Sequence, residues 1–248
     1  MRWVLDLDGV VWLSGQPIPG SAEAVARLKT DGHEVVFLTN NSGPTRAEYA
    51  ERLGKAGVGA EAEELVTSAQ AAASLVSAGS TALILGGAGL HEALQERGVV
   101  PVEAGDHPEA VVVGRTVELD YDELARASTA IRAGARFIAT NTDATFPTPT
   151  GLVPGAGALI AFLATASARQ PEVAGKPNPA TASLVQQRFG QPDVMVGDQP
   201  ATDGKFAELV GASFALVLSG VTSRGDLPVT PTPKIVGDDL ADVVRRLG

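Results

Sequence analysis

The start of the chain alternates between the hydrophobic periods of strands and of helices. Residues 3–7 form an apolar run with the length of a buried strand, and residues 34–38 form a second. Each run is followed by a segment of helical spacing, residues 21–31 and residues 45–56, with apolar side chains on one face. A glycine directly follows each of these segments, where helices commonly end. Two strand–helix units in succession predict a parallel sheet covered by helices.

The middle of the chain repeats this alternation. Three apolar runs predict strands at residues 82–85, 110–113 and 136–139. Helical spacing between them predicts helices at residues 90–97 and 121–133. This part therefore has the pattern of a second α/β unit.

Residues 141–157 interrupt the pattern, because they are rich in Thr, Pro and Gly and predict a long ordered loop. From residue 176 onward, the pattern of the first part returns. We expect helices at residues 179–188, 203–210 and 240–247, and strands at residues 194–196, 214–218 and near Ile235.

These elements predict an α/β fold with a doubly wound, Rossmann-like parallel-sheet core built from both ends of the chain. The core comprises residues 1–78 and 175–248, and residues 79–174 form an inserted α/β domain. One long continuous sheet is the alternative, and 248 residues can bury a core in either case. We favour the insertion because the residues with candidate chemistry lie only in the outer parts.

Composition narrows the class of protein. The net charge of −10 argues against a nucleic-acid surface, which needs clustered Lys and Arg. There is no apolar run of about 18 residues, so no membrane span is expected. Too few residues precede Asp6 for the apolar stretch of a signal peptide, and we expect a cytoplasmic protein.

The absence of cysteine excludes disulfides, thiolate zinc sites and cysteine nucleophiles. The three histidines are far apart in the sequence, which gives poor support to a histidine zinc site or a phosphohistidine. Cysteine chemistry is therefore excluded, and these two kinds of histidine chemistry are poorly supported.

Asp6 and Asp8 stand at the end of the first predicted strand. Residues two apart in a strand point to the same side, so both carboxylates can face one site beyond the strand's carboxyl end. Gly9 would let the backbone approach a bound anion. A plain Asp-Gly turn is the alternative reading.

Asp198 and Asp203 form a second acidic pair, after the strand predicted at residues 194–196. Asp203 could also be an ordinary helix N-cap. Four carboxylates at one sheet edge would form an all-oxygen site, for which Mg²⁺ is the natural ion.

Thr39, Asn40 and Asn41 follow the second strand and precede a helix, a setting in which a hydroxyl and backbone N–H groups can bind phosphate. Ordinary capping is the alternative for these residues. Lys176 lies in a loop that leads into a helix, and it is either a fixed cation for a phosphoryl group or a solvated surface lysine.

Taken in order, these four segments resemble the haloacid dehalogenase (HAD) superfamily of phosphatases. Three of them, with the sequences DLDGV, TNNS and AGKPNP, resemble subfamily IIA, the NagD-like and p-nitrophenyl phosphatase-like group. The insertion is similar to the α/β cap domain of that subfamily, as are the sequences ATNTD at residues 139–143 and GLVPGAG at residues 151–157.

The resemblance implies a magnesium-dependent phosphatase for a small phosphorylated metabolite, with neither nucleic acid nor a membrane as partner. Asp6 would be the nucleophile and Asp8 the general acid and base. Thr39 would bind the transferring phosphoryl group, and Lys176 would neutralise its charge. Dimers formed through the cap are an option that the resemblance also raises.

The remaining roles are implied in the same way. Gly9, Asn40 and Asn41 would contribute to phosphate binding. In the cap, Asn141 and Asp143 are candidates for substrate contact.

The metal would be held by the side chains of Asp6 and Asp198 and by the backbone carbonyl of Asp8. Asp203 would support the waters of the metal or Lys176. The unusual residues between Asp198 and Asp203 leave the placement of Asp203 open.

Two other functions use similar residues. A phosphotransferase or phosphomutase on this fold would pass the phosphoryl group to an acceptor other than water. A phospho-acceptor signalling domain also uses Asp, Thr and Lys around magnesium. It would be about half as long and would carry its phosphorylated Asp on a later strand, whereas here the candidate nucleophile follows the first strand.

Overall fold

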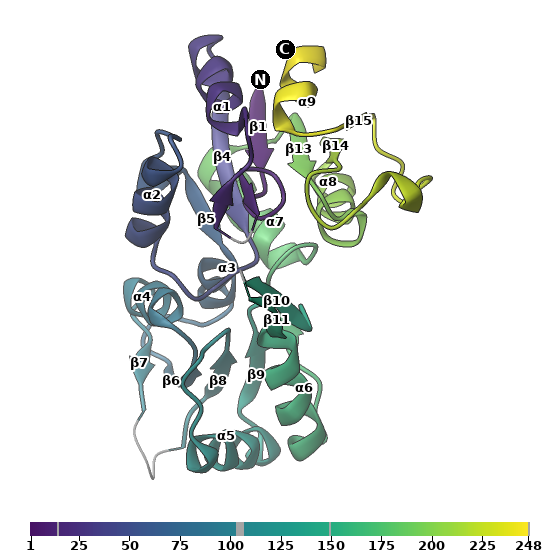
Figure 1. Cartoon of the computed structure of the whole chain (residues 1–248). Helices are drawn as coiled ribbons and strands as arrows, with labels where there is room; N and C mark the ends of the chain where they lie inside the picture. Colours follow the sequence, from purple (N-terminus) through teal and green to yellow (C-terminus); the bar gives the residue numbers. More distant parts are fainter. Residues whose placement is uncertain (14, 103–106, 149, 248) are drawn as a thin grey trace. The chain divides into compact units, whose positions relative to one another are not determined.

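The computed structural model describes residues 1–13, 15–102, 107–148 and 150–247. The chain divides into two compact units (Figure 1). The first unit comprises Met1–Thr39, Arg46–Val66 and Lys176–Gly248. The second unit comprises Asn40–Thr45 and Thr67–Gly175. Each unit contains its own sheet, and the two are described separately.

The first unit is built on a six-stranded sheet in the order β15-β14-β13-β1-β4-β5. From β15 to β4, all neighbouring strands pair in parallel. The central strand β1 therefore has β13 on one side and β4 on the other. The strands are β1 (Arg2–Leu5), β4 (Glu34–Thr39), β5 (Leu65–Thr67), β13 (Val194–Gly197), β14 (Ser213–Val217) and β15 (Ile235–Gly237).

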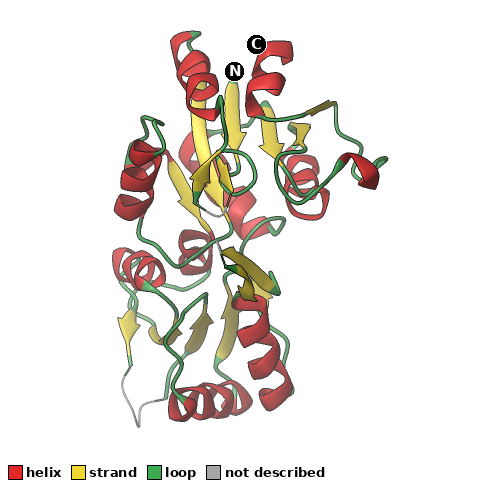
Figure 2. Cartoon of the chain, in the orientation of Figure 1, coloured by secondary structure: helices red, strands yellow, loops and turns green. Residues whose placement is uncertain are grey.

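Helices cover both faces of this sheet (Figure 2). Because side chains alternate along a strand, Trp3 and Leu5 of β1 pack in one apolar cluster and Val4 packs in another. The first cluster includes residues of α1 (Ser21–Thr30), α2 (Arg46–Lys55) and α9 (Leu240–Leu247). The second includes residues of α7 (Pro179–Phe189) and α8 (Lys205–Val210). The predicted doubly wound α/β core is confirmed.

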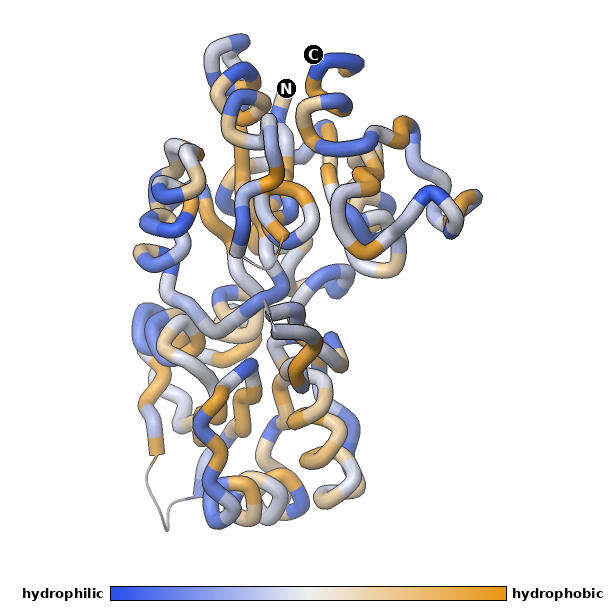
Figure 3. The backbone as a smooth tube through the Cα atoms, in the orientation of Figure 1, coloured by the Kyte–Doolittle hydropathy of each residue, from blue (hydrophilic) through white to orange (hydrophobic). Residues whose placement is uncertain are grey.

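The exposed helices keep one apolar side. Helix α2 buries only Tyr49 and Leu53 among its residues, and its tube in Figure 3 is mostly blue. Its stability therefore depends on the few side chains that reach the sheet, as in an amphipathic surface helix.

The second unit contains a parallel five-stranded sheet in the order β12-β9-β8-β6-β7. Its apolar cluster joins β8 and β9 to helices α5 and α6. The strands are β6 (Thr81–Leu85), β7 (Val100–Pro101), β8 (Ala110–Val113), β9 (Arg136–Ala139) and β12 (Glu172–Val173). The helices are α3 (Ser68–Ser74), α4 (Ala88–Glu96), α5 (Tyr121–Ala133) and α6 (Ala156–Ser167).

The prediction of a loop at residues 141–157 is wrong for part of that segment. Strands β10 (Thr145–Thr148) and β11 (Gly151–Pro154) form an antiparallel hairpin there, with Phe146 opposite Val153. Prolines in both strands hid the hairpin, since proline normally argues against a strand. A two-stranded sheet has only edge strands, which tolerate proline. A shorter hairpin in the first unit, β2 (Trp12–Leu13) with β3 (Gln16–Pro17), was not predicted either.

The second unit contains all of the predicted insertion, residues 79–174, and also α3 and Asn40–Thr45. The insertion includes residues 103–106 and 149, which lie outside the described residues. The predicted boundaries at residues 78 and 174 stay a prediction. Among the described residues, no helix is both long and apolar enough to cross a membrane.

Candidate active site

Strand order brings the candidate residues of the first unit to one edge of the sheet. Asp6 directly follows β1, and Asp198 directly follows the neighbouring strand β13. The Asp6 N–H donates to the carbonyl of Val196 at 2.9 Å, so the two strand ends are in register. Thr39 is the last residue of β4, the neighbour of β1 on its other side. Parallel strands end at the same edge, where α/β proteins place their ligands.

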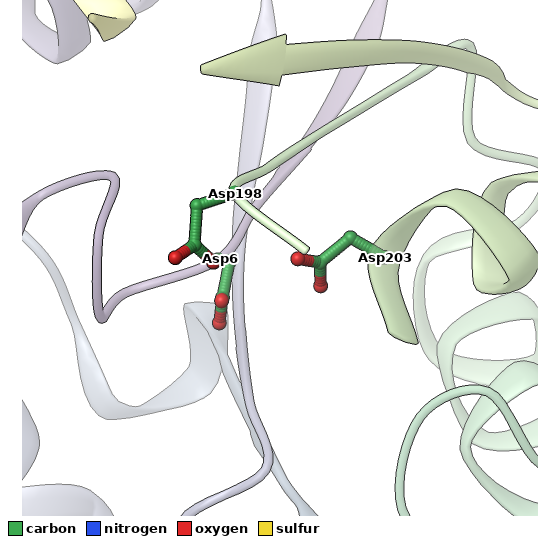
Figure 4. Close-up of side chains that lie close together, drawn as sticks. All are labelled: Asp6, Asp198 and Asp203. Carbon is green, nitrogen blue, oxygen red and sulfur yellow. The ribbon is translucent and has the colours of Figure 1, made fainter. Parts of the chain in front are cut away.

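Three buried carboxylates meet at this edge. One oxygen each from Asp6, Asp198 and Asp203 lies within 4.8 Å of the others. Figure 4 shows the three side chains turned toward a common space. Carboxylates this close repel one another, so the cluster needs cations.

Lys176 supplies one of these cations. Its Nζ lies 2.9 Å from Asp6 Oδ1 and 2.7 Å from Asp203 Oδ1, and its side chain is 1% exposed. Burial by itself lowers the pKa of Lys176, but the charges of Asp203 and Asp6 outweigh it and raise that pKa. Lys176 is therefore a fixed ammonium and not the solvated surface lysine of the alternative reading.

Asp203 is held from two sides. It lies in a π-helical turn, Pro200–Gly204, where its Oδ2 accepts a hydrogen bond from the Gln199 N–H at 3.0 Å. Its Oδ1 accepts from Lys176. The N-cap of α8 is Gly204, so Asp203 is not the helix cap that the alternative reading gave. Of the two supporting roles predicted for Asp203, a direct contact with Lys176 is present in the structure.

One of the two carboxylate oxygens of Asp198 accepts no hydrogen bond from the described residues. Asp198 Oδ2 accepts from the Val221 N–H at 2.6 Å, but the buried Oδ1 has no hydrogen-bond partner in the described part of the chain. Burial, followed by the charge of Asp203, raises the pKa of Asp198 to about 7. Buried polar atoms normally have a partner, and a bound cation would supply one for this oxygen.

Gly9 explains how the backbone fits around Asp198. Its φ is +82°, which favours glycine, and a Cβ on it would lie 2.5 Å from Asp198 Oδ2. Gly220 also approaches this oxygen, and a Cβ on it would lie 2.0 Å away. Larger residues at these two positions would displace the Asp198 carboxylate.

The residues present fit Mg²⁺. With all three carboxyls ionised, three carboxylates and one ammonium leave two negative charges, which a divalent cation would balance. The donors are all oxygens, as Mg²⁺ prefers. Asp6 and Asp198 would hold the ion with the predicted backbone carbonyl of Asp8, since both Asp203 oxygens already accept hydrogen bonds.

Asp8 has a different environment from the cluster. Its Oδ1 accepts from the indole Nε1 of Trp12 at 3.1 Å, and the Trp12 ring stacks on Tyr49. Burial raises the pKa of Asp8, although the Trp12 hydrogen bond opposes this. A carboxyl with a raised pKa can keep a proton near neutral pH and donate it.

The predicted phosphate-binding residues fall in both units. Thr39 is 2% exposed in the first unit, and its side chain is hydrogen-bonded to that of Tyr49. Asn40 and Asn41 belong to the second unit, where Asn41 Oδ1 accepts from the Gly43 N–H at 3.0 Å.

The two candidate cap residues differ in burial. Asp143 is exposed, whereas Asn141 is 4% exposed. Asn141 Nδ2 donates to the Asn40 carbonyl at 2.7 Å, and its Oδ1 accepts from the Asp143 N–H at 3.0 Å. Both ends of the Asn141 amide are thus engaged within the second unit.

Sequence reasoning missed the segment that holds Asp198. Besides the Val221 contact, Thr222 Oγ1 donates to the Asp198 carbonyl at 2.5 Å, and Ser219 Oγ donates to the Gly9 carbonyl at 2.7 Å. These residues follow β14, the neighbour of β13. Their place after a predicted strand was the signal that could have identified them.

Comparison with known proteins gives matches along most of the chain. A family model for haloacid dehalogenase-like hydrolases matches residues 3–100, and a HAD-hydrolase-like model matches residues 173–243. The chain is 38% identical to D-glycerol 3-phosphate phosphatase of Mycobacterium tuberculosis, over 96% of this chain and 69% of that protein. It is 34% identical to dihydroxyacetone phosphatase of Corynebacterium glutamicum, over 98% of this chain and 91% of that protein.

Solved structures agree. The glycerol phosphate phosphatase from M. tuberculosis in complex with magnesium has a TM-score of 0.91 at 36% identity, over 98% of this chain and 75% of that chain. The p-nitrophenyl phosphatase from Archaeoglobus fulgidus has a TM-score of 0.91 at 32% identity, over 99% of this chain and 98% of that chain. NagD from E. coli has a TM-score of 0.88 at 31% identity, over 97% of each chain.

The pKa of Asp198 predicts how Mg²⁺ binding depends on pH. Below pH 7 a proton occupies this carboxyl and competes with the ion, and above pH 7 the carboxylate is ready to bind. We expect Mg²⁺ to raise the melting temperature more at pH 8 than at pH 6, measured by differential scanning fluorimetry. The shift should vanish in Asp198→Asn, and an equal shift at both pH values in the wild type would contradict this.

Removing the ammonium should destabilise the fold. Lys176→Met leaves Asp6 and Asp203 buried without their cation, and we expect a loss of about 3–5 kcal/mol in the free energy of unfolding at pH 8. The loss should shrink at pH 5, because the unpaired carboxyls then take up protons. Urea unfolding at both pH values measures this.

The matched control is Lys29→Met, which breaks a partly exposed pair with Glu64. Its cost should be about 1 kcal/mol or less. Equal costs for the two variants would show that the Lys176 pairs do not stabilise the first unit more than a surface pair does.

Proposed function

The chain belongs to the haloacid dehalogenase-like hydrolase family, and we propose that it is a magnesium-dependent phosphatase that hydrolyses small phosphomonoesters through a phosphorylated Asp6. The resemblance drawn from the four motifs is confirmed by these comparisons. One observation carries the proposal: Asp6 is paired with Lys176 and lies beside Asp198, whose buried Oδ1 has no hydrogen-bond partner among the described residues. The proposed nucleophile, a cation and a proposed metal ligand thus lie together at the carboxyl ends of the strands.

In the first step, an Asp6 carboxylate oxygen attacks phosphorus and the bond from phosphorus to the ester oxygen breaks. The Asp8 carboxyl donates its proton to that leaving oxygen, for which its raised pKa suits it. The products are an alcohol and an aspartyl phosphate on Asp6.

In the second step, Asp8 accepts a proton from water, and the water oxygen attacks phosphorus. The bond from phosphorus to the Asp6 oxygen breaks, which releases inorganic phosphate and restores both carboxyl groups. Lys176 holds Asp6 in one orientation through both steps and offsets charge on the phosphoryl group. Thr39 and the backbone near Asn40 are proposed to bind the phosphoryl oxygens.

Magnesium, when bound, would offset the repulsion between a phosphate dianion and the nearby carboxylates. Asp6 and Asp198 are the proposed side-chain ligands, supported by the buried Asp198 Oδ1, which has no hydrogen-bond partner in the described ranges of the chain. A homologous phosphatase of known structure has been observed with magnesium.

Hydrolysis is favoured over transfer to another acceptor, because the matched relatives are named phosphatases. Those relatives act on glycerol phosphate and dihydroxyacetone phosphate, so we propose a small polyol or sugar phosphate as the substrate class. We also propose a cytoplasmic location and a homodimer, the latter to be tested by light scattering on the purified protein.

The nucleophile is tested by substitution. Asp6→Asn keeps the size of the side chain but removes its nucleophilic oxygen, so hydrolysis of p-nitrophenyl phosphate should fall by about 10³-fold or more. Initial rates of p-nitrophenol release, with saturating Mg²⁺, measure this. Asp31→Asn, at the exposed end of α1, is the matched control and should keep the wild-type rate. Turnover that persists in Asp6→Asn, or in wild type with excess chelator, would refute the proposed function.

A further inference from the structure

The chain passes between the two units next to two proposed catalytic residues. It leaves the first unit after Thr39 and enters the second at Asn40. It returns to the first unit for Arg46–Val66, passes into the second again at Thr67, and finally leaves the second unit at Gly175 and re-enters the first at Lys176. The segments beside Thr39 and Lys176 are therefore held by contacts of the second unit.

One dipeptide of the second unit contacts both segments. Thr140 and Asn141 directly follow β9 and are 0% and 4% exposed. Asn141 Nδ2 donates to the Asn40 carbonyl at 2.7 Å, next to Thr39 in the sequence. The carbonyl of Thr140 accepts from the Gly175 N–H at 2.7 Å, next to Lys176 in the sequence.

Further buried contacts strengthen this arrangement. Thr140 Oγ1 donates to Ser42 Oγ at 3.1 Å, and the Arg115 N–H donates to the same oxygen at 3.1 Å. Ser68 Oγ donates to the Asn40 carbonyl, which therefore accepts two side-chain hydrogen bonds. Segment 40–45 is thus fixed at several points.

Gly175 shows how tightly the two segments pack against the dipeptide. A Cβ on Gly175 would lie 2.4 Å from the Thr140 carbonyl oxygen and 2.7 Å from Asn40 Oδ1. Asn40 and Gly175 are far apart in the sequence, yet they meet at Thr140. A change at this point would act on both segments.

We propose that Thr140 and Asn141 are positioning residues that set the placement of Thr39 and Lys176 from within the second unit. This inference rests on the proposed function and replaces the predicted substrate contact by Asn141. Both ends of its buried amide are engaged in the protein, which supports a positioning role over a binding role. The second unit would thereby influence the rate of phosphoryl transfer through residues that touch neither phosphate nor metal.

The test is Asn141→Asp, which keeps the acceptor for the Asp143 N–H but turns a carboxylate oxygen toward the Asn40 carbonyl. Small misplacements of catalytic groups are costly, and we expect kcat for p-nitrophenyl phosphate to fall by about tenfold to a hundredfold. The Mg²⁺ concentration for half-maximal activity should stay unchanged, because Asp6 and Asp198 are both in the first unit. A general folding defect would change both quantities.

Thr140→Val and Thr140→Ser form a second, milder pair of variants. Valine removes the hydroxyl that donates to Ser42, whereas serine keeps it. We expect a lower kcat for valine and near wild-type kcat for serine. The control is Ser167→Ala, which also removes a buried hydroxyl, one that donates to the Leu163 carbonyl in α6, and it should keep the wild-type kcat.

Hydrogen–deuterium exchange separates this inference from the proposed function. In Asn141→Asp, backbone amides of residues 39–41 and 175–176 should exchange faster than in wild type, whether or not the protein turns over substrate. Unchanged exchange there, or a kcat equal to that of Ser167→Ala, would overturn the positioning role. A wild-type protein without phosphatase activity would instead refute the proposed function, and exchange would still decide the inference.

Discussion

The candidate site depends on one buried cation. The Lys176 ammonium lies between the carboxylates of Asp6 and Asp203, and without it the three acidic side chains would share this space only at a large cost in stability or by taking up protons. It balances only part of their charge, and it leaves Asp6 and Asp198 facing a region that favours a divalent cation. The same contact fixes the orientation of the proposed nucleophile. The clustered carboxylates that would bind this cation therefore also destabilise the fold.

Sheet topology is what allows this concentration of charge. Strands β13, β1 and β4 are neighbours and parallel, so Asp198, Asp6 and Thr39 emerge at one edge although they are distant in sequence. The apolar clusters on both faces of the sheet supply the stability that the acidic edge costs. The second unit has its own sheet and core, and the dipeptide Thr140–Asn141 links its fold to the segments beside Thr39 and Lys176.

Much of this could be predicted from the sequence, because the informative signals were local. Hydrophobic period located most of the strands of both large sheets and most of the helices, and Asp6 and Asp198 could be placed because each directly follows an apolar run. The hairpin of β10 and β11 could not, since its prolines contradict strand propensity and only pairing explains it. Similarly, the contact of Asp203 with Lys176 depends on a π-helical turn, and the buried contact of Asn141 is with Asn40, 101 residues away in the sequence. Such long-range contacts leave no periodic pattern.

The central claim is that Asp6 carries the phosphoryl group, and trapping that species tests it most directly. Enzyme mixed with excess p-nitrophenyl phosphate and Mg²⁺ is quenched in acid within one turnover, digested and analysed by mass spectrometry. We expect the added mass of one phosphoryl group on the peptide that contains Asp6, located at that residue by fragmentation. Active enzyme with no phosphopeptide under rapid quenching, or with the phosphoryl group on another residue, would contradict it.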